Sequence, residues 1–188
     1  MKRKSKPRWE QQALSLRTDH TWKAPPGYKV FVADRGAVRF HFPDSWVVVP
    51  ASDSIELYNK QPPEDDCRLT VSYLRLPPLD WKELPLAELI TAALKDDRRK
   101  LLFRSDIREA PREGLEIAWI EVRFLDAHEQ REACSRLAIA RGWNLQALIT
   151  FDCWVEDQLS LEPVWEEVLR SVELGRYVDD PTAGDTVQ

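Results

Sequence analysis

Glycine is scarce in this chain, with 6 residues among 188. Loops that cradle phosphate groups need glycines at fixed spacings, and neither G-x-x-x-x-G-K-[ST] nor G-x-G-x-x-G occurs. The G-x-S-x-G motif, which carries the nucleophilic serine of many hydrolases, is absent as well. These absences argue against nucleotide binding through the common loops and against serine hydrolysis of that type.

Cysteine and histidine are equally rare, with three of each. The thiols belong to Cys67, Cys134 and Cys153, an odd number without C-x-x-C spacing, which argues against a disulfide framework. The imidazoles are widely separated and form no zinc motif, so we expect no metal and no cofactor. A nucleophilic Cys153 would need a partner such as His41 across the sheet, and the sequence leaves its reactivity open.

Long apolar runs are missing too. No stretch approaches the roughly 18 uninterrupted apolar residues of a membrane span, and no apolar segment follows the basic start as in a secretory signal. Unpaired cysteines are typical of a reducing compartment. We therefore expect a cytoplasmic protein.

Positive charge is concentrated at the N-terminus of an otherwise acidic chain. The first eight residues hold five basic groups and no acid, whereas the other 180 hold 22 basic and 32 acidic groups. The basic groups belong to Lys2, Arg3, Lys4, Lys6 and Arg8. We expect a flexible tail over 1–24, with electrostatic contact to phosphates or anionic lipid as the alternative. An acidic body is not the footprint of a specific nucleic-acid-binding domain.

The rest of the chain alternates between strand and helix signals. Period-2 or β-prone runs, separated by turn residues, predict about seven to nine strands. The expected strands cover 28–33, 37–42, 46–49, 55–58, 67–76, 102–110, 115–125, 131–140 and 145–154. Helical periodicity predicts one helix over 84–101 and a second between a Ser160 cap and Gly175.

The short turns between the later strands imply antiparallel neighbours, and each helix has a single apolar face that must cover a sheet. We therefore predict an α+β fold: an αβα sandwich with a central, mostly antiparallel sheet and helices packed on its faces. The predicted domain spans 25–175, between the N-terminal tail and a C-terminal tail over 176–188.

Two segments resemble the PsbP-like superfamily. They are RFHFPDSW (39–46), an aromatic strand followed by a Pro-x-x-Trp turn, and ITFDCWVEDQLSLEPVWEEVLRSVEL (149–174), a last strand followed by a helix. That superfamily includes the extrinsic lumenal protein of photosystem II, a eukaryotic Ran-binding import factor and bacterial chaperones of type VI secretion effectors. The resemblance implies the αβα sandwich over about 28–174 and carries no functional residue. It makes Phe40, Phe42 and Trp46 structural and turns His41 to the opposite side of its strand.

Tryptophan is unusually abundant, with 8 residues. The patterns place Trp46, Trp119 and Trp165 in the core, whereas Trp81 and Trp143 fall in loops or turns, where exposed aromatic rings often mark partner surfaces. Trp81 could instead fold back as a lid over the helix that follows it. We predict a non-enzymatic binding or adaptor protein, such as an effector chaperone, with a protein partner. The alternative is a ligand-binding protein or an enzyme with a pocket between sheet and helix.

Overall fold

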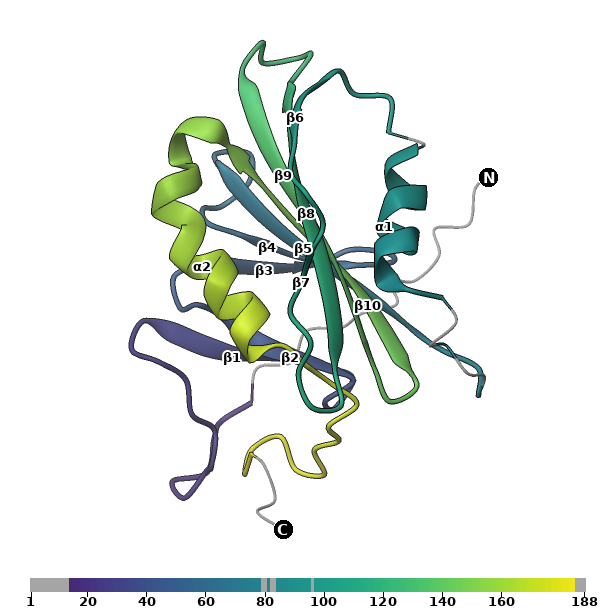
Figure 1. The fold of residues 1–188 in the computed structure, drawn as a ribbon. Coiled ribbons are helices and arrows are strands. Elements are labelled where there is room, and N and C mark those ends of the chain that lie inside the picture. The colour runs from purple at the N-terminus through teal and green to yellow at the C-terminus, as the bar shows by residue number, and fades with distance from the viewer. Residues whose placement is uncertain (1–13, 79–80, 82–83, 96, 185–188) are drawn as a thin grey trace, which may run out of the picture.

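The computed structural model describes residues 14–78, 81, 84–95 and 97–184, and within them eleven strands and two α-helices (Figure 1). Every strand pairing is antiparallel. The α+β sandwich with helices on both faces of the sheet is confirmed. The strand bounds are β1 Tyr28–Ala33, β2 Val38–Pro43, β3 Val47–Pro50, β4 Ile55–Tyr58, β5 Cys67–Arg75, β6 Leu101–Arg104, β7 Arg108–Glu109, β8 Glu116–Leu125, β9 Glu132–Gly142, β10 Leu145–Trp154 and β11 Glu173–Leu174.

The large sheet has the order β3-β4-β5-β10-β9-β8-β6, with β7 paired to β8, and a smaller sheet has the order β1-β2-β11. The central strands β5, β10, β9 and β8 are 9 to 11 residues long. Burial alternates along β5 and β10, whereas β8 and β9 are buried along most of their length because their two faces belong to two different cores. Helix α1 (Leu86–Lys95) covers one face of the large sheet, and α2 (Gln158–Ser171) covers the other.

The main core lies between the large sheet, the small sheet and α2. Trp165 of α2 is fully buried and packs against Phe151 and Trp119, with ring centroids 5.6 Å apart in both pairs. Trp46 stacks on Phe151 from the other side at 6.2 Å, and Phe40 of β2 is fully buried in the same cluster. The structural roles expected for these aromatic residues are confirmed.

A smaller core lies under α1. Ile90 of that helix is fully buried against Ile120 of β8 and Ile139 of β9. Helix α1 packs on this part of the sheet, and on the same side Leu74 of β5 and Leu148 of β10 are 50% and 40% exposed. One face of the sheet is therefore only partly covered.

The first predicted helix and the predicted strand that follows it differ most from the structure. The first helix covers Leu86–Lys95 instead of 84–101, and after it Arg99 bonds back to Asp97 and stacks on Phe124 before β6 begins. The predicted strand over 102–110 is divided into β6 and β7, which both pair with β8. The strand count is accordingly larger than expected.

The predicted Ser160 cap is wrong. A 3-10 turn, η2 (Val155–Asp157), continues directly from β10, so α2 begins at Gln158 with Asp157 at the N-cap position. The Ser160 hydroxyl donates to the Asp157 carbonyl oxygen (2.8 Å) inside the first turn. At the other end, α2 stops at Ser171 and β11 follows, so Gly175 ends β11 rather than the helix.

The described parts of the two chain ends lie together. The Trp22 indole N–H donates to the Pro181 carbonyl oxygen (2.8 Å), and the Thr21 amide donates to Ala183 (2.8 Å). Val178 is fully buried and its amide donates to the Arg35 carbonyl oxygen (2.8 Å). The basic residues expected to form an electrostatic tail, from Lys2 to Arg8, lie outside the described residues.

Candidate functional site: a groove at one end of the sheet

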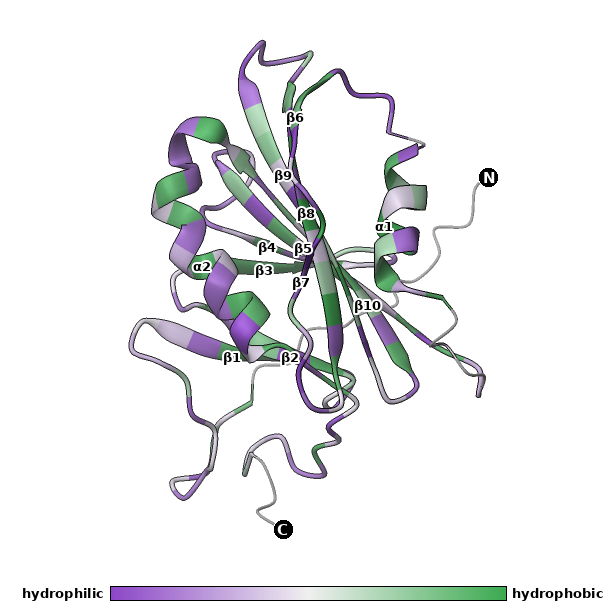
Figure 2. Ribbon diagram, viewed as in Figure 1, coloured by the Kyte–Doolittle hydropathy of each residue, from purple (hydrophilic) through white to green (hydrophobic). Residues whose placement is uncertain are grey.

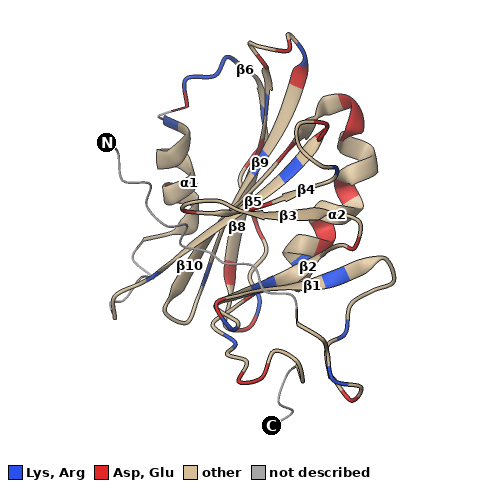
Figure 3. Cartoon of the chain, turned by 180° about the vertical axis from the view of Figure 1, so that it is seen from behind, with Lys and Arg blue, Asp and Glu red and all other residues tan. Residues whose placement is uncertain are grey.

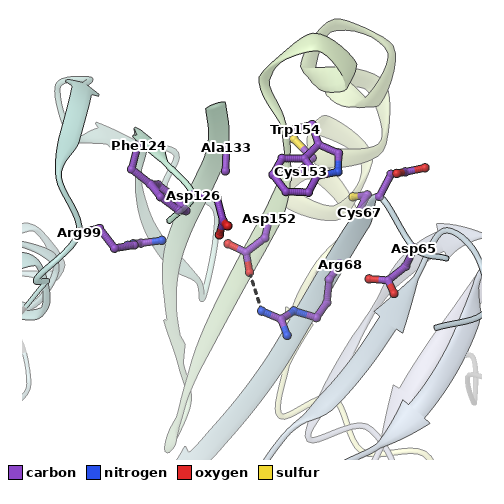
Figure 4. A pocket seen from close by; sticks show the side chains of 11 residues that line it. Asp65, Cys67, Arg68, Arg99, Phe124, Asp126, Ala133, Asp152, Cys153 and Trp154 are labelled. Atoms are coloured by element: carbon purple, nitrogen blue, oxygen red, sulfur yellow. Dashed lines mark hydrogen bonds and ion pairs between the residues drawn. The ribbon is translucent and has the colours of Figure 1, made fainter. Parts of the chain in front are cut away.

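A groove of about 250 Å³ crosses the end of the large sheet on the α1 side (Figure 4). Strand register places Phe124, Ala133 and Trp154 directly opposite one another on β8, β9 and β10. Neighbouring strands lie about 4.8 Å apart, so the backbones of Phe124 and Trp154 are separated by roughly 10 Å, with the small alanine between them. The methyl side chain between two large rings produces the hollow.

The next row of the sheet forms a hydrogen-bonded series in the groove. Asp152 accepts from the Ser135 hydroxyl (2.6 Å) and pairs with Arg68 of β5 (3.3 Å). Both Arg68 and Asp152 are partly exposed to solvent, so this pair adds little stability and mainly positions the two side chains. In Figure 4 the carboxylates of Asp126 and Asp152 lie between the guanidinium groups of Arg99 and Arg68.

Each aromatic wall carries an arginine of the same chain. The Arg99 guanidinium lies 4.1 Å from the Phe124 ring centroid and is held by Asp97 (2.7 Å). Arg131 lies 4.5 Å from the Trp154 ring centroid. These cation–π contacts fix the rings in place, because each guanidinium stacks on a ring face and is itself oriented by a carboxylate, Asp97 for Arg99 and Glu156 for Arg131.

Two of the carboxylates that line the groove, those of Asp66 and Asp126, have lowered pKa values. A hydrogen bond from Lys60 lowers the pKa of Asp66, and a further hydrogen bond from the Trp154 side chain acts in the same direction. The backbone amides of Glu129 and His128 lower the pKa of Asp126. Carboxylates with lowered pKa values are poor proton donors at neutral pH, so these two suit ionic binding better than general acid catalysis.

The three cysteines meet in a single row of the sheet. Cys67 of β5 is opposite Cys153 of β10, which is opposite Cys134 of β9, and all three thiols are free and buried. Burial raises the pKa of Cys67, and the hydrogen bond with Cys153 followed by burial raises that of Cys134. Thiols held in the protonated form are poor nucleophiles and poor metal ligands. Within the described residues, no group of three or more metal-ligating side chains has the geometry to hold a metal ion.

His41 is engaged with α2 and not with a thiol. Its Nδ1 lies 2.6 Å from Glu167 Oε1, and its backbone amide donates to the Ser171 hydroxyl (2.8 Å). Glu167 also accepts two hydrogen bonds of 2.6 Å from Arg170. The alternative of a Cys153–His41 pair is therefore wrong, and the histidine instead ties β2 to the last turns of α2.

Trp143, predicted as a partner contact, stands at the tip of the hairpin that joins β9 to β10. Its side chain is 80% exposed and its φ is 54°. The left-handed region is costly for a bulky residue and is normally taken by glycine or asparagine. A methyl group on Gly175 would lie 3.1 Å from three atoms of Trp143, so the indole rests on that glycine and presents its remaining surface to solvent.

Trp81, the other predicted contact, is half-buried, and its indole N–H donates to the carbonyl oxygen of Pro77 (3.0 Å) in the same loop. Its sequence neighbours at 79–80 and 82–83 lie outside the described residues. The groove residues Phe124, Ala133 and Trp154 had not been predicted as a site. The structure thus brings neither predicted tryptophan to the groove.

Comparison with known proteins supports the fold and gives a family. The cyanobacterial PsbP protein CyanoP from Synechocystis sp. PCC 6803 superposes with a TM-score of 0.55 at 11% identity, over 80% of this chain and 94% of that one. LpqN from Mycobacterium tuberculosis, described as involved in cell envelope biogenesis, gives 0.54 at 13% identity over 77% and 88%. The PsbP-like resemblance is thereby confirmed at the level of the fold.

One curated protein is much more similar to this chain in sequence than these two structures are. The uncharacterised protein alr1449 of Nostoc sp. is 43% identical over 184 residues, which covers 97% of this chain and 96% of that protein. Residues 29–178 match the Alr1449 family, and this segment contains both helices and all but one residue of the strands. The chain therefore belongs to the Alr1449 family.

Proposed function

We propose that this protein is a non-enzymatic adaptor that binds a protein partner through the β9–β10 hairpin tip, with Trp143 as the central contact. The observation that carries the proposal is the strained and exposed conformation of Trp143. A residue held at positive φ costs of order 1–3 kcal/mol, and such strain is retained where surrounding structure and function require it. Tryptophan is also the residue type most enriched among the energetic centres of protein interfaces.

The surroundings of the hairpin tip suit a protein contact. Tyr177, two residues after the supporting Gly175, is 62% exposed. Arg35 of the β1–β2 turn is joined to this segment through the Val178 amide. Aromatic rings together with arginine are the composition typical of interface centres. A chaperone of a secreted effector, as some PsbP-like bacterial proteins are, is one form of this adaptor role.

The test is a photo-crosslinking experiment in the native cell. A benzophenone amino acid replaces Trp143, and a matched variant carries it at Leu159, which is 88% exposed on α2. We expect a discrete crosslinked protein, identified by mass spectrometry, from position 143 and not from position 159. Crosslinks that are equally diffuse at both positions would refute the hairpin contact.

The substitution Trp143→Asn separates binding from folding. Asparagine tolerates the left-handed conformation, so we expect the free energy of unfolding to rise by about 0.5–1 kcal/mol. The same substitution should lower affinity for the crosslinked partner at least tenfold, because the exposed indole is lost. Thermal and urea unfolding measure the first effect, and a binding titration measures the second. An unchanged affinity would show that the indole is not a contact.

A second candidate function is binding of a small molecule in the groove, favoured by the fixed aromatic walls around a hollow of about 250 Å³. Its volume lies just below the usual range for ligand sites, about 300–1,000 Å³, so a small molecule is the fitting occupant. An NMR fragment screen that follows the Trp154 indole N–H tests it, with Trp143 as the internal control. Saturable shifts of the Trp154 signal alone would favour the small-molecule function.

We also propose a cytoplasmic location. The support is the row of three free cysteines, which in an oxidising compartment would be at risk of forming a cross-strand disulfide. The described residues contain no helix long and apolar enough to cross a membrane. Fractionation of the native cell with an antibody tests the location.

A further inference from the structure

Strand β6 forms one edge of the large sheet. It pairs with β8 on one side, with a shift of register between Leu101 and Phe103, and no strand of the described residues pairs with its other side. All four residues of β6 are exposed, and three are large and apolar: Leu101 (36%), Leu102 (50%) and Phe103 (46%) (Figure 2). An edge strand presents unpaired backbone N–H and C=O groups, and proteins usually protect such edges with charged side chains.

The position of β6 keeps it apart from the proposed hairpin contact. Leu101 is opposite Phe124, near the end of β8 that leads into the 126–131 turn. The Trp143 hairpin lies at the other end of β9, where Gly142 pairs with Leu145. A second binding surface at β6 would therefore act independently of the first.

The apolar part of β6 is flanked by basic residues. Lys100 precedes it and Arg104 ends it, and neither side chain makes an ion pair with another described residue. The blue segments that run into and along β6 in Figure 3 show this arrangement. The strand itself is held in place by Arg123 of β8, whose guanidinium lies 5.1 Å from the Phe103 ring centroid.

The charges decide what can add to this edge. Antiparallel pairing of two copies centred on Leu102 would set Lys100 of each copy opposite Arg104 of the other. Like charges directly opposite one another on neighbouring strands are destabilising, whereas opposite charges and apolar pairs each contribute roughly 0.2–1 kcal/mol. A strand with carboxylates at its two ends and apolar residues between them is therefore favoured over a second copy.

We propose that β6 is a docking edge that accepts an extended, acid-flanked apolar segment of a partner protein as an additional antiparallel strand. Backbone hydrogen bonds to the free side of β6 supply the pairing, and side-chain contacts supply the choice of partner. The carboxylates face Lys100 and Arg104, and the apolar residues between them cover Leu102 and Phe103. This role goes beyond the adaptor contact at Trp143 and does not depend on it.

The test uses two synthetic peptides that differ only in charge. One contains Glu-Val-Ile-Val-Glu and the other Lys-Val-Ile-Val-Lys, each between glycine-serine ends for solubility. We expect the acidic peptide to bind with a dissociation constant below about 1 mM and the basic peptide at least tenfold more weakly. NMR titration should shift the backbone amides of β6 and leave those of the β9–β10 hairpin unchanged.

Two variants control the assignment. Leu102→Glu removes apolar contact from the middle of the edge and adds a negative charge beside the carboxylates of the peptide, and we expect it to weaken binding of the acidic peptide at least fivefold. Trp143→Asn, at the other end of the sheet, should leave that binding unchanged, which separates this proposal from the proposed function. Circular dichroism confirms that both variants fold.

Three results would overturn the proposal. They are equal affinity for the two peptides, absence of binding at millimolar concentration, and shifts confined to residues outside β6. Sedimentation analysis supplies a fourth, since a dimer of the intact protein that Leu102→Glu dissociates would identify a second copy as the occupant.

Discussion

Arg136 is a charged residue that is buried in the core and needs charged partners there. Its side chain is 2% exposed, and its Nε donates to Glu121 (3.0 Å) while Nη2 pairs with Glu162. Its guanidinium also lies 6.0 Å and 5.9 Å from the ring centroids of Trp119 and Trp165. Sequence patterning placed those tryptophans in the core correctly. It could not place Arg136 there, because the carboxylates that permit its burial come from residues 15 and 26 positions away.

We predict that Arg136→Ala is strongly destabilising. Loss of the guanidinium leaves Glu121 buried without its main partner, which costs about 3–5 kcal/mol. Arg176→Ala is the matched control, since Arg176 is exposed and its pair with Glu173 lies at the surface. We expect that control to change the free energy of unfolding by less than about 1 kcal/mol. Urea denaturation followed by tryptophan fluorescence measures both, and equal effects would contradict the role of the buried pair.

At the scale of elements, regular strands could be predicted and their interruptions could not. The ranges expected for β1, β4 and β10 agree with the structure, because period-2 patterning between turn residues is a local signal. The predicted strand over 102–110 is divided into two strands, and each of them pairs separately with β8. The groove could not be predicted either, because it depends on the pairing register between strands, which brings Phe124, Ala133 and Trp154 into one row.

The attachment of the C-terminal segment to the β1–β2 turn gives a prediction at this scale. Gly36 has a φ of 102°, and a methyl group there would lie 1.9 Å from the Arg176 carbonyl oxygen. Gly114 also has a positive φ, 70°, but has no neighbour within 4 Å of the same position. Gly114→Ala therefore measures the cost of the backbone conformation alone, about 1 kcal/mol.

We expect Gly36→Ala to cost at least about 2 kcal/mol more than Gly114→Ala, because the added methyl must displace the Arg176 backbone, which follows directly after the strand paired with β2. Hydrogen exchange should also accelerate at the Gly175 and Val178 amides, which bond to Ala37 and Arg35. Equal destabilisation by the two substitutions would show that the Arg176 backbone moves away from the added methyl group without a cost in free energy.

For the whole molecule, stability depends on ionised carboxylates that connect the layers. Burial alone would raise the pKa of Glu121, but hydrogen bonds from Arg136 and Gln158 outweigh it and lower the pKa below the ordinary value of 4.5. A hydrogen bond from Arg170, assisted by His41, lowers the pKa of Glu167 in the same way. Glu121 joins the large sheet to α2, and Glu167 joins α2 to the small sheet.

These shifts predict acid unfolding with a definite sign. A carboxylate whose folded pKa lies below its unfolded pKa contributes its full stabilisation above the unfolded value and loses it as pH falls toward the folded value. The free energy of unfolding should therefore fall between about pH 5 and pH 3, as the unfolded state takes up protons that the folded state does not.

Glu121→Gln should be less stable at neutral pH and should show a shallower fall. Glu113→Gln, at an exposed turn position, should follow the unaltered protein at every pH. Urea titrations across this range measure how the free energy of unfolding depends on pH. If Glu121→Gln leaves this dependence unchanged, Glu121 does not contribute to the acid sensitivity of the contacts between the layers.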